Sequence, residues 1–539
     1  MLHTPRSTRR LVFSSGIVLT ARCLLALGGV VAAVLIAGRF GAGQESDAYF
    51  TARLIPVVFS MSLGTAFNLA FLPVYTQTLH EQGERAAARL AGDFRNLTLG
   101  VSLAAAVAYV LLADWIVALL APGFSADAQR LTVTLTRIMA ASIVFVNLYA
   151  VMDSVLNSGH RYAVSSLASL CLPAGTLVGI LVLDGVFAMQ MAGVAAGVLA
   201  GAAIQFLVVT PSVRDKFHGL PSLAGLRSPQ LHAVLRQFTA LMFVIGASQV
   251  NLAVNRMIAS LVGEGAVSAF GFAFVLIGLA PALVAMPVFK VLYPELLHFV
   301  AAGDRAALRR LFQTNLFVIA FLTFPLVMIF ASFATPIVGL TFQYGQFDAL
   351  AGERTADVIR YLSISLWPSV TSILVNYYFC ATGRASLPAR VGVVLVGVNA
   401  ALAYTLMRVM DVGGIALANS LVALVNLAVM GVLLSRDLGG LGLRSLVGPL
   451  GKTAAAAVCA GLALSYSGDW LAPAVDLRTV FHKVAAYGGL VAASLGIYFA
   501  VNLLLRNRKM LELAAVIRGG LRPEAASGSE LEAAAELLP

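Results

Sequence analysis

Long apolar runs without a single charge recur along almost the whole chain, and they limit the possible folds more than any other feature. Three of them cover residues 97–113, 163–183 and 488–505. A helix needs about 20 such residues to cross a bilayer, and it satisfies its own backbone hydrogen bonds there. Only 11% of the 539 residues are charged, whereas soluble domains carry about 25%. The sequence therefore predicts an all-α polytopic membrane protein.

Hydropathy predicts about 14 transmembrane helices, and loop charges predict their orientation. The connections after even-numbered helices are basic, such as Arg85, Arg89 and Arg95 after the second, whereas the connection 263–265 after the seventh has no basic residue. Because basic loops stay in the cytoplasm, we expect both termini there. These loops also account for the net charge of +11, so nucleic acid is not expected as a partner. The predicted helices cover residues 13–38, 50–77, 97–120, 132–156, 162–183, 187–209, 237–262, 267–296, 313–341, 357–381, 388–408, 412–434, 448–466 and 480–505.

An internal repeat divides the chain into two related halves. Residues 43–50 (GQESDAYF) parallel residues 263–270 (GEGAVSAF), and residues 83–87 (GERAA) parallel residues 303–307 (GDRAA), both at an offset of 220 (263 − 43 and 303 − 83). The offset spans six predicted helices, so the halves run the same way through the membrane, as in some transporters. The predicted division is an N-terminal lobe (1–210), a cytoplasmic linker (211–236), a C-terminal lobe (237–435), two further helices (448–505) and a cytoplasmic tail (506–539).

Patterns typical of catalytic or metal-binding sites do not occur in the sequence. The four cysteines lie far apart inside apolar runs, and the seven histidines lie in predicted loops or at helix ends. Neither zinc-ligand spacing nor a nucleophile or phosphate-loop motif stands out. The longest connection, residues 210–236, is short for an extramembrane catalytic domain. We therefore expect a transporter and not an enzyme, with no cofactor and no metal site.

Ionisable residues inside predicted spans are costly and are therefore candidates for function. Arg256 is the strongest, because it lies well inside a predicted helix and shares a helical face with Gln249. A guanidinium there can bind a phosphate through two hydrogen bonds, while an ion pair with a carboxylate of another helix is an equal alternative. Arg53 lies within reach of the outer interface. The candidate substrate-binding residues are Arg256, Arg53, Arg22, Gln249, Asn255 and Asp47.

Several short motifs resemble those of one family. Residues 39–43 (RFGAG), residues 46–50 (SDAYF) and residues 342–345 (FQYG) are similar to signatures of the MurJ/MviN family, the lipid II flippases of the multidrug/oligosaccharidyl-lipid/polysaccharide exporter superfamily. The resemblance implies a V-shaped bundle of two six-helix lobes around a cationic cavity, with a groove on the last two helices for a polyprenyl tail. It also implies a bacterial inner-membrane protein that moves an undecaprenyl-diphosphate-linked saccharide outward by alternating access.

The arginines with which this family lines its cavity are displaced in this chain. Aligned without gaps from Gly41, the family positions in helices 1, 2 and 8 fall at Ala26, Ala32 and Ser60 and near Phe274-Val275. Arg22, Arg53 and Arg256 are the arginines that could replace them. Besides the saccharide and membrane lipids, cell-wall or polysaccharide synthesis proteins are possible partners.

Two alternatives to a peptidoglycan-precursor flippase stay open. One is a flippase for the lipid-linked repeat unit of an exopolysaccharide or capsule. The other is a drug/cation antiporter of the same superfamily, which needs carboxylates deep in its N-terminal lobe, and Asp153 is the single candidate. Asp153, Lys290 and Arg360 lie near predicted helix ends, where reaching the membrane interface is the favoured interpretation.

Overall fold

The computed structural model describes residues 5–159, 161–217, 228–474 and 480–512. Every regular element within these ranges is a helix, as the apolar runs predict. The N-terminal helices are α1 (Pro5–Phe40), α2 (Gln44–Gln82), α3 (Glu84–Leu111), α4 (Ala113–Leu120), α5 (Ala126–Ala140), α6 (Ser142–Ser158), α7 (Tyr162–Ala168), α8 (Cys171–Val178), the π-helix η1 (Gly179–Asp184) and α9 (Gln190–Val213), followed by the 3₁₀ turn η2 (Arg214–Lys216).

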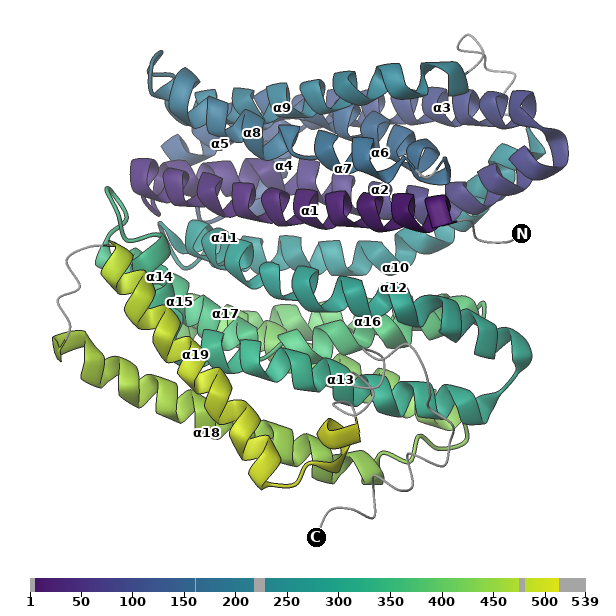
Figure 1. The fold of residues 1–539 in the computed structure, drawn as a ribbon. Coiled ribbons are helices and arrows are strands. Elements are labelled where there is room, and N and C mark those ends of the chain that lie inside the picture. Colours follow the sequence, from purple (N-terminus) through teal and green to yellow (C-terminus); the bar gives the residue numbers. More distant parts are fainter. Residues whose placement is uncertain (1–4, 160, 218–227, 475–479, 513–539) are drawn as a thin grey trace.

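The second half of the chain repeats this pattern of long and interrupted helices. It consists of α10 (Pro229–Ser260), α11 (Ala266–Ile277), α12 (Leu279–Ala302), α13 (Arg305–Ser332), α14 (Ala334–Thr341), α15 (Ala349–Ser363), α16 (Leu366–Ala381) and α17 (Ser386–Asp437). Two further helices, α18 (Arg444–Ala474) and α19 (Val480–Leu504), follow. In Figure 1, α1–α9 form the upper part of the molecule and α10–α17 the lower part, and α18 and α19 lie along the lower left. We call α1–α9 the N-terminal lobe and α10–α17 the C-terminal lobe.

The longest element, α17, contains two of the predicted spans. Its 52 residues include Asp411, whose backbone is non-helical (φ 54°, ψ −139°). A Cβ atom at Gly414 would lie 2.4 Å from the carbonyl oxygen of Leu406, so the chain folds back on itself at Asp411. The predicted break between residues 408 and 412 is therefore correct, although both helical segments carry the single label α17.

Fewer helices of the described ranges meet a strict criterion of length and hydropathy for a membrane span than the sequence predicts. Nine helices of the described ranges are long and apolar enough to cross a membrane, or ten if α15 and α16, bent by 46°, form one span. The difference arises partly because α17 counts once and partly because other spans are interrupted. The predicted 267–296, for example, is divided at Gly278 into α11 and α12. The total of about 14 stays a prediction.

The buried residues divide in the way expected of a V-shaped bundle. One large core combines residues from both lobes, including Ile36 of α1, Phe50 of α2, Phe272 of α11 and Phe342 after α14. These residues lie where α1 ends and α2 begins, and in Figure 1 the end of α1 lies beside α11 at the left. Toward the other end the cores separate, one in the N-terminal lobe with the start of α10 and one in the C-terminal lobe. The core that the lobes share thus lies at one end, while α2 and α10 also contact each other at the other end, where Gln230 donates a hydrogen bond to Gln82 at 3.3 Å.

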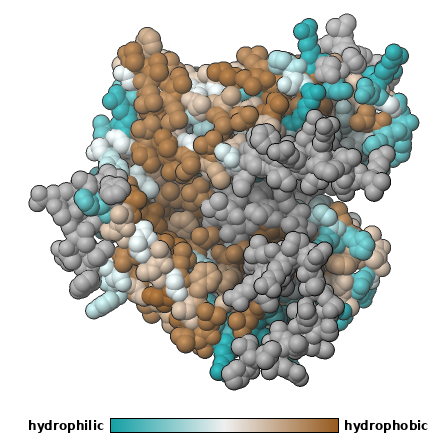
Figure 2. Space-filling view, viewed as in Figure 1, coloured by the Kyte–Doolittle hydropathy of each residue, from teal (hydrophilic) through white to brown (hydrophobic). Residues whose placement is uncertain are grey.

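The exterior carries many large apolar side chains. Leu111, Trp115, Val409 and Leu504 are among many large apolar side chains that lie exposed. Figure 2 shows hydrophobic residues gathered across the middle of the molecule, with hydrophilic ones at its two ends. A soluble protein rarely exposes an apolar surface of this extent, so this surface faces lipid.

Candidate functional site

Asp47 binds the two lobes together at the end where they share a core. Its side chain is only 2% exposed, and its carboxylate accepts hydrogen bonds from the backbone N–H groups of Gly265 and Ser268, each at 2.7 Å. These groups belong to the N-terminus of α11, where backbone donors lack partners within the helix and a negative charge is favourable. Asp47 of one lobe therefore caps a helix of the other. The structure places this predicted substrate ligand in an inter-lobe contact.

Glu264 makes the reciprocal contact. Its Oε1 atom accepts a hydrogen bond from the backbone N–H of Gln44, at 3.0 Å, at the start of α2. Positions 44 and 264 are equivalent in the repeat of 220 residues. Each lobe thus supplies a carboxylate to the first turn of the corresponding helix in the other lobe.

Glycines let the two backbones touch beside these carboxylates. Gly41 (φ 65°) has no room for a side chain, because a Cβ atom would lie 2.6 Å from the carbonyl oxygen of Gln346. At Gly345 (φ 62°) a Cβ atom would lie 2.1 Å from the carbonyl oxygen of Gly38, which also accepts a hydrogen bond of 3.0 Å from the Gln346 N–H. We call residues 38–47, 260–268 and 345–346 the seam.

Sequence reasoning did not predict the seam, although its signals were present. The glycines at 41 and 345 belong to the two motifs that carry the family resemblance, RFGAG and FQYG. Glu264 lies in the repeated segment but appeared only as part of a loop without basic residues. Motif glycines with positive φ favour close backbone approach, yet sequence alone does not say which backbone approaches.

Arg256 and Arg53 bring two positive charges together from opposite lobes, next to the seam. The Nη1 atom of Arg256, in α10, donates a hydrogen bond to the carbonyl oxygen of Phe50 in α2. Arg53, also in α2, is close enough to Arg256 to interact electrostatically. Its guanidinium contacts Tyr49, with Nη1 3.4 Å from the phenol oxygen and the guanidinium carbon 5.9 Å from the ring centre.

These two arginines have no carboxylate partner in the part of the chain that the structure describes. The ion pairs of that part involve other residues, such as Arg39 with Asp184 and Arg354 with Asp411. The alternative in which Arg256 pairs with an acidic side chain therefore finds no support there. Within the described ranges, two electrostatically coupled cations from opposite lobes thus lie beside the seam without a carboxylate counterion.

Asn255 is oriented into the C-terminal lobe instead of toward Arg53. Its side chain is 1% exposed. Its Oδ1 accepts a hydrogen bond from Asn399 at 2.6 Å and its Nδ2 donates to Asn419 at 3.2 Å, an acceptor shared with Asn251. Both polar atoms of the Asn255 amide are therefore paired, as is usual for a buried polar side chain. Asn255 thus belongs to an internal cluster of asparagines.

The other predicted candidates lie apart from Arg53 and Arg256 or outside the description. Gln249 is half-buried in α10, about two turns before Arg256. Arg22 is exposed on α1, about 27 Å along the helix from Phe40, and so lies farther from the seam. Asp153 accepts hydrogen bonds from Ser165 and Asn157 within the N-terminal lobe.

The two remaining ionisable residues of the predicted spans complete this comparison. Arg360 pairs with Asp357 on its own helix. The Lys290 side chain lies outside the described residues.

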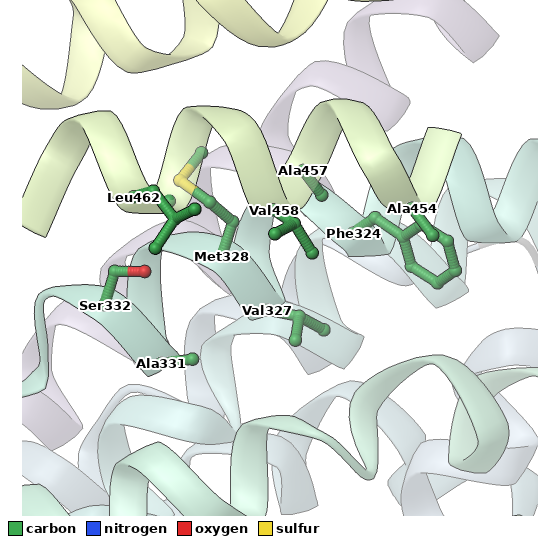
Figure 3. Close-up of a pocket in the computed structure, with 10 residues that line it drawn as sticks. Phe324, Val327, Met328, Ala331, Ser332, Ala454, Ala457, Val458 and Leu462 are labelled. Carbon is green, nitrogen blue, oxygen red and sulfur yellow. The ribbon is translucent and has the colours of Figure 1, made fainter. Parts of the chain in front are cut away.

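An apolar cavity of about 330 Å³ lies between α13 and α18. Figure 3 shows Phe324, Met328, Val458 and Leu462 facing one another across it, with Ser332 as the single polar side chain among those drawn. Such a lining suits a hydrocarbon chain. The helices approach closely beside it at Gly461, where a Cβ atom would lie 2.7 Å from the Ser332 hydroxyl.

A lipid-facing exterior and two helical lobes joined at a seam, with two arginines of opposite lobes beside it, are the features of a multi-pass membrane transporter. A family model described as lipid II flippase MurJ matches residues 36–476, which is most of the chain. The protein therefore belongs to the MurJ family of lipid II flippases, and this membership makes it a transporter of the bacterial inner membrane and not an enzyme.

Individual relatives agree with this assignment. The chain is 28% identical to the lipid II flippase MurJ of Burkholderia cenocepacia, over 78% of this chain and 82% of that protein. A protein of Rhizobium meliloti, described as a probable lipid II flippase MurJ, is 30% identical over 95% of this chain and 96% of its own length.

Solved structures share the fold at lower identity. A lipid II flippase MurJ in an inward closed conformation has a TM-score of 0.72 at 19% identity, covering 93% of this chain and all of that one. A multidrug transporter of the MATE family in an inward-facing conformation has a TM-score of 0.66 at 13% identity, covering 79% and 98%. These likenesses concern the fold alone.

Proposed function

We propose that this protein moves a lipid-linked saccharide diphosphate of the lipid II type across the bacterial inner membrane, by alternating exposure of a site between its lobes. The proposal depends most on one observation. Arg53 and Arg256 present two uncompensated positive charges from opposite lobes, beside the seam. Membership of the lipid II flippase family favours a peptidoglycan precursor over an exopolysaccharide repeat unit.

The two guanidinium groups suit a diphosphate. Arginine binds phosphate oxygens through paired, charge-assisted hydrogen bonds, and a cation within the membrane is costly without an anion. In this state Arg256 donates to the Phe50 carbonyl, so that contact is exchanged for the phosphate when substrate binds. Because the two arginines come from different lobes, a bound diphosphate links the lobes directly.

The seam supplies a gate that opens and closes in this cycle. The loop charges predict that its end of the molecule faces away from the cytoplasm. Opening it breaks the two hydrogen bonds of Asp47, the bond from Gln44 to Glu264 and the bond from Gln346 to Gly38. Each contributes roughly 0.5–3 kcal/mol, the carboxylate bonds the most. The summed free energy of these hydrogen bonds is of the size that the free energy of substrate binding can offset.

The hydrocarbon tail of the substrate stays in the lipid phase during transport. The family resemblance implies a groove on the last two helices, and the apolar cavity between α13 and α18 lies on one of them. We place part of the tail along α18, while the diphosphate and sugar occupy the space between the lobes.

Replacing the two arginines tests the proposal. In vesicles that contain the purified protein and fluorescent lipid II, Arg256→Ala and Arg53→Ala should each lower the flipping rate about tenfold or more, since each removes a charge-assisted contact. Arg130→Ala is the matched control, because Arg130 is exposed on α5 and pairs with Asp127. Wild-type flipping rates in both arginine variants, at normal protein levels, would contradict the proposed site.

A further inference from the structure

A second apolar cavity, larger than the one in Figure 3, lies at the opposite end of the molecule from the seam. Its volume is about 600 Å³, and it lies between α16, the second half of α17 and the start of α18. Its lining includes Trp367, Leu427, Gly431, Val432 and Val447. Val432 and Val447 are exposed, so the cavity opens toward surrounding lipid.

One cation stands at the rim of this cavity. Arg436, in the last turn of α17, is exposed and belongs to the lining. The adjacent carboxylate, Asp437, is already occupied, because Arg384 Nη1 donates to it at 2.8 Å and the Tyr378 hydroxyl also donates to it. Among the described residues Arg436 forms no ion pair. The first residue of α18, Arg444, adds a second exposed cation after the connecting loop.

The loop that joins α17 to α18 is fixed in place beside Arg436. The Nε atom of Arg309 donates to the carbonyl oxygen of Leu438 at 2.7 Å, and Gln313 Nε2 donates to that of Leu441 at 2.6 Å. Both donors come from α13. These hydrogen bonds fix the shape of the rim. The Arg436 guanidinium lies at its edge, and the apolar cavity lies behind it.

We propose that this cavity binds an anionic glycerophospholipid, with one acyl chain inside and the phosphate on Arg436. The lining supplies apolar contact for the chain, and basic pockets between membrane helices bind anionic headgroups. The membrane itself supplies the occupant. The site is separate from the proposed substrate path, because it involves neither Arg53 nor Arg256, and it meets α18 at residues 446–450 instead of 454–462.

Filling the cavity is a direct test. A Cβ atom at Gly431 meets no atom within 4 Å, so Gly431→Leu occupies the empty space without a backbone clash. Gly397→Leu is the matched control, because Gly397 lies on the same helix, is exposed and is equally unhindered. Arg436→Gln removes the cation, and Arg390→Gln is its control, an exposed arginine near the start of α17 that does not line the cavity.

Binding is measured by native mass spectrometry of the purified full chain titrated with phosphatidylglycerol, phosphatidylcholine or undecaprenyl phosphate. We expect Gly431→Leu and Arg436→Gln each to weaken phosphatidylglycerol binding about tenfold, while both controls bind as the wild type does. Unchanged phosphatidylglycerol binding in Gly431→Leu overturns the proposal. So does an equal loss in the Gly397→Leu control, or a loss confined to undecaprenyl phosphate. Flipping activity is not the readout, so this result is independent of the proposed function.

Discussion

At the level of single residues, the polar side chains of this protein fall into two groups with different purposes. Asp47 and Asn255 have their hydrogen bonds satisfied by the protein itself, whereas Arg53 and Arg256 lack a counterion within the described ranges. The sequence indicated all four as candidate binding residues. It could not separate the groups, because the partners of Asp47 and Asn255 lie more than 100 residues away in sequence.

Replacing Asp47 should shift the balance between closed and open seam. Asp47→Ala removes two charge-assisted hydrogen bonds that cross the lobes, each worth about 1.5–3 kcal/mol, so the open population should rise at least tenfold. Labelling of Ser46→Cys by a membrane-impermeant thiol reagent, in a chain whose native cysteines are replaced by alanine, measures this population in cells, because residue 46 is fully buried while the seam is closed.

Asp348→Ala is the control for that experiment. Asp348 caps α15 within its own lobe, accepting a hydrogen bond from the Ala351 N–H at 2.7 Å. Its loss should leave labelling at the seam unchanged. Equal labelling rates in Asp47→Ala and the wild type would show that the carboxylate does not hold the seam closed.

At the level of helices, the sequence predicts where helices occur better than it predicts where they are interrupted. Long uncharged apolar runs predicted spans where α1, α9, α13 and α19 occur, because a helix that crosses the membrane requires such a run. The interruption at Gly278 was not predicted, because the sequence stays apolar on both sides of this residue. The reversal at Asp411 was expected, since a polar residue separates two full-length apolar runs there.

Close packing of α8 and η1 against α9 depends on glycine. A Cβ atom at Gly197 would lie 2.4 Å from the carbonyl oxygen of Gly175. Gly197→Ala should therefore push the two helices apart and destabilise the protein by about 1–3 kcal/mol, seen as a lower unfolding temperature in detergent.

Gly100→Ala provides the comparison, because Gly100 is exposed on α3 and a Cβ atom there meets nothing within 4 Å. It should leave stability unchanged or raise it slightly, since alanine favours a helix over glycine. A similar fall in both variants would mean that the loss is not due to packing.

At the level of the whole molecule, the repeat of 220 residues predicted two parallel halves, and the structure joins them through equivalent positions. Gln44 and Glu264, at matching places in the repeat, meet across the seam. The sequence could not predict which end of the bundle is closed, since both states use the same helices. It also could not predict that α2 and α10 bring Arg53 and Arg256 together, because this depends on how the lobes pack.

Cross-linking the seam tests the central claim that transport requires the lobes to separate there. The four native cysteines, Cys23, Cys171, Cys380 and Cys459, are first replaced by alanine, and the pair Gln44→Cys and Glu264→Cys is introduced. A short, reducible bis-thiol reagent then joins the lobes. We predict that lipid II flipping in vesicles stops on cross-linking and returns on reduction, while each single-cysteine variant is unaffected by the reagent. Full flipping by the cross-linked protein would contradict the account.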